Sequence, residues 1–170
     1  MFRLLNKEVL KSPVKVISVD NFITGSADSS VSNDPNIIHV WADVVHPLPI
    51  REDIHFIIHA AGIASPVFYM KFPIETIESA VTGVRNLLDL ARKNNNLEGF
   101  LYFSSSEIYG DPDPKFVPTP ETYHGHVSSI GPRACYDESK RLGETIATIY
   151  HQQYGIPVTI VRPFNVFGPG

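Results

Sequence analysis

Two short runs, SSSEIYG at Ser104–Gly110 and RACYDESK at Arg133–Lys140, organise the rest of this chain. The first run directly follows Phe100–Phe103, an apolar segment typical of a buried strand. Small hydroxyls and a carboxylate at the carboxyl end of such a strand lie where open α/β sheets bind their ligands. The run therefore predicts a ligand site at a strand end.

The second run places Tyr136 and Lys140 four residues apart, so the two side chains share one face of a helix. An ammonium group beside a phenol stabilises the phenolate and lowers the pKa of the tyrosine, as a tyrosine base needs near neutral pH. The same spacing also occurs by chance as a surface pair. The hydroxyl-tipped strand upstream is what favours the catalytic interpretation.

Composition limits the classes of protein to which the chain can belong. Its 170 residues are 43% hydrophobic, enough for one core, and no basic run accompanies the net charge of -4, so we expect no nucleic-acid partner. The single cysteine, Cys135, excludes an internal disulfide and fits a reducing compartment. No apolar run approaches the roughly 18 residues of a membrane span, and the N-terminus lacks a signal-peptide core. We expect a soluble, cytoplasmic protein without a membrane segment.

Strand-like and helical patterns alternate along the chain. Apolar, β-branched runs predict strands at 14–19, 37–42, 54–59, 100–103 and 158–161. Helices are predicted from Pro73 to the Lys93–Asn96 run and from Tyr136 to about Tyr154, and Met1–Leu10 fits the tail of another. Polar, Gly- and Pro-rich segments predict loops at 24–35, 111–120 and 123–132. This alternation predicts an α/β fold with a doubly wound, mostly parallel sheet.

Helical spacing also predicts which side chains face the core. On the first of these two helices the expected core residues are Ile74, Ile77, Val81, Val84, Leu88 and Ala91. On the second helix they are Leu142, Ile146 and Ile149.

Several polar or small residues fall at the carboxyl ends of the predicted strands, where such a sheet has its ligand crevice. They are Asp20, Asp43, Ala60–Gly62, Ser104–Glu107 and Pro163–Asn165. A carboxylate at Asp20 would accept hydrogen bonds from the ribose hydroxyls of NAD and repel the 2′-phosphate of NADP, although an Asp also commonly starts a turn. Ala60–Gly62 would let a ligand approach the backbone, or let the next helix pack tightly.

Histidines give no comparable signal. His59 stands without partner ligands at useful spacing and is interpreted as a core or strand-end histidine. The His124-Gly125-His126 run is too short a pattern to predict a metal, and we assign no metal site.

The chain resembles the extended short-chain dehydrogenases/reductases of the nucleotide-sugar epimerase/dehydratase group, and within it the UDP-glucuronate decarboxylase (UDP-xylose synthase) branch. The resemblance covers nearly the whole chain. It is carried by the segments Val19–Gly25, Ser104–Pro112, Gly125–Val127, Gly131–Lys140 and Arg162–Pro169.

The resemblance implies a role for each residue of the catalytic run. Tyr136 would take the proton from the sugar 4-hydroxyl while NAD accepts the hydride from C4, and Lys140 would hold the nicotinamide ribose. Ser105 would bind the 4-oxygen, with Ser106 and Glu107 orienting substrate or moving a proton. The 4-keto intermediate of UDP-glucuronate would then lose carbon dioxide and, after hydride return, give UDP-xylose.

The resemblance also implies residues that bind the cofactor and the substrate. NAD would be held by Asp20 and Asn21 at the adenosine ribose, Asp43 and Val44 at the adenine, Ala60 and Ala61 along the strand end, and Pro163 beside the nicotinamide. Tyr136 and Lys140 would contact the cofactor as well. The sugar nucleotide would face Glu107, Arg133, Asn165 and the Tyr123–His126 loop. Family members are commonly dimers through a helix bundle that contains the Tyr136 helix, so we expect a homodimer.

Departures from the family pattern leave other interpretations open. The first strand, its Gly-rich phosphate loop and most of the C-terminal substrate domain are absent, so residues 1–170 are interpreted as a partial NAD-binding Rossmann domain. Ala80 stands where the family usually has Asn, and Ser105 where many decarboxylases have Thr. One alternative is a catalytically incompetent fragment. Another is a 4-epimerase or 4,6-dehydratase, which the Ser106-Glu107 pair disfavours.

Overall fold

The fold is given by a computed structural model, which describes residues 14–25 and 34–168. The chain divides into two compact units, Met1–Asp43 and Val44–Gly170, which are described separately. The helix expected at Met1–Leu10 lies outside the described residues, as does most of the loop expected at 24–35.

The first unit contains a pair of parallel strands, as predicted. β1 (Val16–Asp20) pairs in register with β2 (Ile37–Trp41), so that Asp20 lies opposite Trp41 at the carboxyl end. Within the described part of this unit no residue is buried, and the Trp41 ring contacts Phe22 edge-on, with ring centroids 4.9 Å apart.

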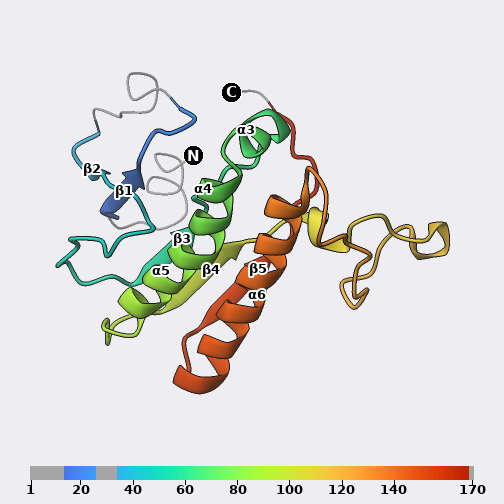
Figure 1. Ribbon diagram of the computed structural model, residues 1–170. Coiled ribbons are helices and arrows are strands. Elements are labelled where there is room, and N and C mark those ends of the chain that lie inside the picture. The colour runs from blue at the N-terminus through green and yellow to red at the C-terminus, as the bar shows by residue number, and fades with distance from the viewer. Residues whose placement is uncertain (1–13, 26–33, 169–170) are drawn as a thin grey trace. The chain divides into compact units, whose positions relative to one another are not determined.

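The second unit is built on a parallel sheet in the order β3-β4-β5 (Figure 1). Its strands are β3 (Phe56–His59), β4 (Gly99–Phe103) and β5 (Val158–Val161), with register pairs such as His59–Tyr102 and Tyr102–Ile160. All three strands were predicted. Their carboxyl ends meet at one edge, which is where the predicted site residues of this unit emerge.

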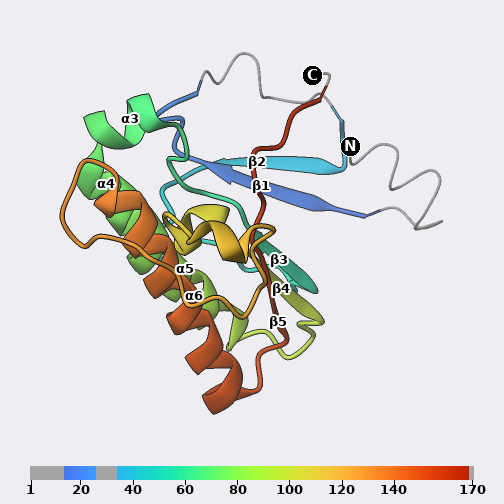
Figure 2. The ribbon, with the colours of Figure 1, turned by 90° about the vertical axis from the view of Figure 1, so that its right-hand side faces the viewer.

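Helices cover one face of this sheet (Figure 2). The helices of this unit are α3 (Pro66–Lys71), α4 (Pro73–Glu78), the π-helical turn η2 (Ser79–Gly83), α5 (Val84–Ala91) and α6 (Ala134–Tyr154). Of these, α5 contacts β3 and α6 contacts β5. Pro66 and Pro73 stand at the first turns of α3 and α4, where a proline loses no helical hydrogen bond. Gly155 ends α6 with a φ of 69°, a left-handed conformation that glycine adopts without strain.

The core of the second unit lies between this sheet and the helices. Val84 and Leu88 are 0% exposed, and Phe100 and Tyr102 of β4 pack against them from the sheet side. Burying each such side chain contributes about 1.5–3 kcal/mol. The Tyr102 hydroxyl fits against α6 because residue 143 is glycine: a Cβ there would lie 2.0 Å from it.

The helix predicted from Pro73 differs from the observed one in two ways. It is interrupted by η2, a feature that hydrophobic spacing does not reveal, and its first apolar residues, Ile74 (65%) and Ile77 (39%), are exposed rather than in the core. Val84, Leu88 and Ala91 are buried as predicted, and Val81 is half-buried. The sheet lies beneath α5 and not beneath α4, so apolar periodicity alone overestimated the buried stripe.

The prediction for the second helix was wrong at two of three positions. Leu142 and Ile149 are 47% and 41% exposed, and only Ile146 packs against the core. The face of α6 that meets the sheet carries small or polar residues instead, namely Ser139, Lys140, Gly143 and Ala147.

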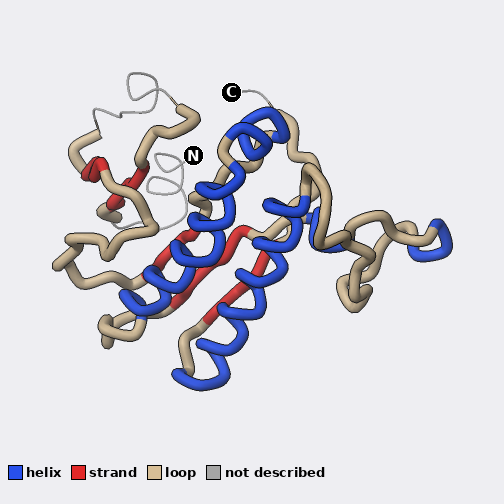
Figure 3. The backbone as a smooth tube through the Cα atoms, viewed as in Figure 1, coloured by secondary structure: helices blue, strands red, loops and turns tan. Residues whose placement is uncertain are grey.

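Between β4 and α6 the chain is mostly irregular, as predicted (Figure 3). It contains two short 3-10 turns that were not predicted, η3 (Ser106–Tyr109) and η4 (Pro114–Phe116). Gly110 and His126 form an isolated parallel bridge, so the intervening residues 111–125 leave and return at one place. We call this segment the 111–125 excursion. Among the described residues, no helix is long and apolar enough to cross a membrane.

Candidate active site

Tyr136 and Lys140 lie on consecutive turns of α6, as their spacing predicts. Both side chains are buried. The Lys140 ammonium donates a hydrogen bond to the Phe103 carbonyl at 2.7 Å, at the end of β4. It lies 5.8 Å from the centroid of the Tyr136 ring. The strand end thus fixes the lysine beside the tyrosine.

Burial changes the acidity of this lysine. Lys140 is 6% exposed, and loss of hydration lowers its pKa to about 8. Within residues 14–25 and 34–168, its ammonium makes this one hydrogen bond, which leaves donor capacity for a ligand. A hydroxyl-rich ligand such as a ribose would meet that capacity.

Ser105 at the end of β4 caps the 3-10 turn η3, which begins at Ser106. Ser105 is 8% exposed and its hydroxyl accepts a hydrogen bond from the Glu107 amide at 3.2 Å. The Ser104 hydroxyl is buried without a hydrogen-bond partner in the part of the chain that the structure describes. The Ser106 amide donates to the Pro163 carbonyl at 3.0 Å, which joins the ends of β4 and β5. Ser106, which is predicted to orient the substrate, is therefore bonded directly to Pro163, which is predicted to lie beside the nicotinamide.

A residue that the sequence did not reveal packs on the tyrosine of the pair. Tyr69 of α3 is 2% exposed and stacks on Tyr136, with ring centroids 5.2 Å apart and planes 14° from parallel. The Cys135 thiol contacts the Tyr69 carbonyl at 3.6 Å, and burial raises the pKa of that thiol. Ser65 followed by Pro66 is the helix-start signal that could have predicted α3.

Two residues predicted to face the substrate pair with each other. Arg133 donates to Glu107, and its Nε lies 3.8 Å from Asp137. Burial raises the pKa of Asp137, an effect that Arg133 partly offsets. A cation flanked by two carboxylates beside the catalytic run could exchange one of these partners for an anionic substrate group.

The strand end of β3 lies on the other side of Lys140. A Cβ at Gly62 would be 3.6 Å from the Lys140 Nζ, which places the Ala60–Gly62 run beside that ammonium. His59 is buried as predicted, against Tyr102, and burial together with the nearby charge of Lys140 lowers its pKa to about 3. It is therefore a neutral core imidazole. The described residues contain no group of three or more metal-ligating side chains.

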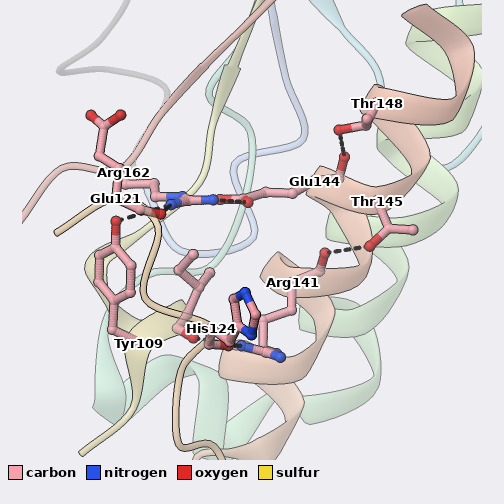
Figure 4. Close-up of polar contacts among 9 residues, drawn as sticks. Tyr109, Glu121, His124, Arg141, Glu144, Thr145, Thr148 and Arg162 are labelled. Carbon is pink, nitrogen blue, oxygen red and sulfur yellow. Dashed lines mark hydrogen bonds and ion pairs between the residues drawn. The ribbon is translucent and has the colours of Figure 1, made fainter. Parts of the chain in front are cut away.

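The remaining sugar-facing predictions fall on irregular segments. Tyr123 is half-buried in the 111–125 excursion, with its ring 5.0 Å from that of Phe116. Asn165 is exposed after β5. Sequence reasoning missed the arginines that hold this region: Arg162 and Arg141 reach Tyr109, Glu121 and His124 (Figure 4).

In the first unit, three predicted adenosine-binding residues come together at the ends of β1 and β2. The Asn21 side chain donates to the Asp43 carboxylate at 2.8 Å, and the Asp20 carboxylate accepts from the Phe22 amide at 2.8 Å. Asp20 is thus both a turn-forming residue and an exposed carboxylate. Val44 belongs to the second unit, where its side chain is buried against Gly83, so it could contribute to adenine binding only through its backbone.

Comparison with known proteins places this geometry in a family. A family model described as "NAD dependent epimerase/dehydratase family" matches residues 3–170. UDP-glucuronic acid decarboxylase 5 of Arabidopsis thaliana is 42% identical over 168 residues, an alignment that covers 98% of this chain and 48% of that protein. The chain spans about half the length of the curated relatives it matches.

Solved structures show the same fold. A UDP-glucose 4-epimerase from Thermotoga maritima, solved with UDP-glucose, matches with a TM-score of 0.78 and 24% identity, covering 99% of this chain and 52% of that one. A UDP-glucuronic acid 4-epimerase from Bacillus cereus, solved with NAD, matches with a TM-score of 0.71 and 22% identity over 91% of this chain and 50% of that one. At these identities the likeness establishes a Rossmann-like α/β fold with a parallel sheet, as predicted.

Proposed function

The chain belongs to the NAD dependent epimerase/dehydratase family, and from that premise we propose that it carries the catalytic residues of a UDP-glucuronate decarboxylase. The observation that carries the proposal is the buried Tyr136–Lys140 pair next to the Ser105 tip of β4. Its chemistry is that of proton transfer to and from an alcohol. The Ser106-Glu107 sequence and the 42% identity to a plant UDP-glucuronic acid decarboxylase favour decarboxylation over epimerisation.

The residues present fit NAD. Lys140 lies beside Gly62, where a side chain would fill the space next to its ammonium. The Pro163 carbonyl accepts a hydrogen bond from the Ser106 amide, at the carboxyl ends of β4 and β5. In the first unit, the Asp20 carboxylate and the Asn21–Asp43 pair offer acceptors and donors for an adenosine. We assign Lys140, Ala60, Ala61 and Pro163 to the nicotinamide side, and Asp20, Asn21, Asp43 and the Val44 backbone to the adenosine side.

The protein's own groups have defined tasks in this reaction. Bound NAD supplies the oxidation of the sugar at C4 and the later return of the hydride. Tyr136 accepts the proton of the 4-hydroxyl, and Ser105 donates a hydrogen bond to the 4-oxygen. Lys140, as a cation beside Tyr136, stabilises the phenolate form.

Decarboxylation follows from the ketone at C4. The bond between C5 and the carboxylate carbon breaks, and carbon dioxide leaves. The electron pair moves into an enolate whose oxygen, at C4, stays hydrogen-bonded to the hydroxyls of Ser105 and Tyr136. A proton is then added at C5. Arg133, released from Glu107, would hold the anionic substrate. The freed Glu107 would take up a proton from solvent and deliver it to C5, while Tyr136 keeps its proton for the 4-oxygen.

Product analysis tests the proposal. The purified chain is incubated with NAD and UDP-glucuronate, and its products are identified by NMR, with Tyr136→Phe as the matched control. We expect UDP-xylose and carbon dioxide from the wild-type chain only. A 4-epimer or a 4-keto-6-deoxy sugar would show that the chain belongs to a different branch of the family.

A second candidate is a catalytically incompetent fragment of such an enzyme. It is favoured by one observation, that the chain spans 48% of the length of the Arabidopsis relative. A folded chain that binds no NAD would support this candidate. If the chain binds NAD but gives no product, the defect lies in the binding or conversion of the sugar nucleotide.

We also propose a homodimer formed through α4 and α6, in a cytoplasmic protein. The two helices lie side by side, and their exposed apolar side chains are Ile74, Ile77, Leu142 and Ile149. Sedimentation of Leu142→Glu should show a monomer where the wild type is a dimer, while the same change at Ile130, 86% exposed outside these helices, leaves the dimer intact. A dimer that persists in Leu142→Glu would contradict this interface.

The proposed cytoplasmic location rests on a different observation. The single cysteine, half-buried, fits a reducing compartment, and imaging a tagged chain checks the location.

A further inference from the structure

Two arginines connect the catalytic helix to the 111–125 excursion (Figure 4). Arg141 follows Lys140 directly on α6, and Arg162 follows β5. Each guanidinium reaches both the 3-10 turn η3 and the excursion, so the two segments are held by the same groups.

Arg141 makes both contacts with one nitrogen. Its Nη1 donates to the Ile108 carbonyl at 2.8 Å and to the His124 carbonyl at 2.9 Å. The backbone comes this close because residue 125 is glycine at φ 88°: a Cβ there would lie 2.6 Å from the Arg141 Nη1. The end of the excursion is therefore built around this guanidinium.

Arg162 makes contacts with three different segments. Its Nε and Nη2 donate to the two carboxylate oxygens of Glu144 at 2.8 and 2.7 Å, a bidentate pair with α6. Its Nη1 donates to the Tyr109 hydroxyl and to the Glu121 carbonyl, both at 2.9 Å. The Glu144 side chain is 12% exposed, so this ion pair is shielded from water and fixes the direction of the guanidinium.

We propose that Arg141 and Arg162 are positioning residues which hold the 111–125 excursion so that Tyr123 is presented to the sugar nucleotide. Tyr123 lies between their two points of attachment, Glu121 and His124. Because Arg141 and Glu144 share α6 with Tyr136 and Lys140, the substrate loop is aligned on the catalytic helix itself. The inference rests on the proposed function for the identity of the ligand, but the anchoring does not.

Limited trypsin digestion of the full chain tests the anchoring. Lys115 is exposed in the excursion, and Lys93, exposed after α5, serves as an internal reference. We expect Arg141→Gln and Arg162→Lys to speed cleavage at Lys115 about five- to tenfold, with cleavage at Lys93 unchanged. Arg162→Lys keeps a charge opposite Glu144 but cannot form the fork, and the half-exposed Arg141 can be replaced without leaving a buried charge. Faster cleavage at Lys93 as well as at Lys115 would show that a variant has not folded. The result of the other variant then decides whether the excursion is anchored.

Ligand titration supplies a readout that a merely structural role would not change. In the NAD-loaded chain both variants should bind UDP-glucuronate about tenfold more weakly, with unchanged affinity for NAD. Arg92→Gln, which removes an exposed arginine on the opposite end of the helical layer, should change neither affinity. Unchanged cleavage at Lys115, or equal losses for both ligands, would overturn the proposal. A wild-type chain that binds no UDP-glucuronate would overturn the proposed function and the role of Tyr123, while the cleavage ratio would still decide the anchoring.

Discussion

The two units of the chain hold their predicted site residues in different ways. In the second unit Tyr136, Lys140 and Ser105 are buried, and protein groups fix each of them: Tyr69 by stacking, the Phe103 carbonyl and the Glu107 amide by hydrogen bonds. In the first unit the exposed Asp20 accepts a hydrogen bond within its own turn, the half-buried Asn21 and Asp43 bond to each other between the ends of β1 and β2, and no described residue is buried. The proposed reacting groups are thus preorganised by a core, and the proposed adenosine-binding groups by hydrogen bonds at the strand ends.

The largest expected effect is on the catalytic side of this comparison. Tyr136→Phe should lower turnover about 10²–10⁴-fold, because it removes the group that accepts and returns the proton. NAD affinity should be unchanged, since the ring and its stacking on Tyr69 remain. Steady-state kinetics and an NAD titration of the same sample check this. Turnover that survives in Tyr136→Phe would assign the proton transfer to another residue.

Stability should differ between the units. Leu88→Ala, at a fully buried position, should lower the free energy of unfolding by about 2–5 kcal/mol, because it leaves a cavity between α5 and the sheet. Val40→Ala in β2 removes a half-buried side chain and should cost under about 1 kcal/mol. Urea unfolding measures both. Equal losses would mean that the first unit contributes a core of its own.

The pH dependence of stability should reveal the buried His59. Its pKa falls from 6.5 to about 3 on folding, so between these values the unfolded chain binds the extra proton. Folding stability should therefore drop as pH falls below 6.5, by at most about 1.4 kcal/mol per pH unit from this group. His59→Asn should remove that contribution, and His55→Asn, at an exposed position, should retain it. Parallel pH profiles for wild type and His59→Asn would contradict the buried neutral imidazole.

The smallest effect is expected in the first unit. Asp20→Asn should weaken NAD binding about tenfold, by replacing a charge-assisted acceptor for the ribose hydroxyls with a neutral amide. Turnover at saturating NAD should be retained. Isothermal titration provides the affinity, and Asp34→Asn, at the amino end of the strand pair and away from Asp20, is the control. An unchanged NAD affinity would leave Asp20 with its turn-forming role alone.

Much of this arrangement could be predicted from particular residues. Apolar runs, four of them with β-branched residues, predicted the five strands, and the four-residue spacing correctly put Tyr136 and Lys140 on one helical face. Apolar spacing could not show that Ile74, Leu142 and Ile149 are exposed, because it records a stripe and not what the stripe faces. Tyr69, Arg141 and Arg162 were missed because their partners are distant in sequence, and many are backbone carbonyls without any side-chain signal.

Calorimetric titration of the purified chain with NAD, and then with UDP-glucuronate, tests most directly whether the chain binds both ligands of the proposed reaction. The account predicts saturable binding of NAD, followed by saturable binding of the sugar nucleotide that Arg141→Gln weakens. A folded chain that binds neither ligand would contradict it, and the decarboxylase chemistry would then require more protein than these 170 residues.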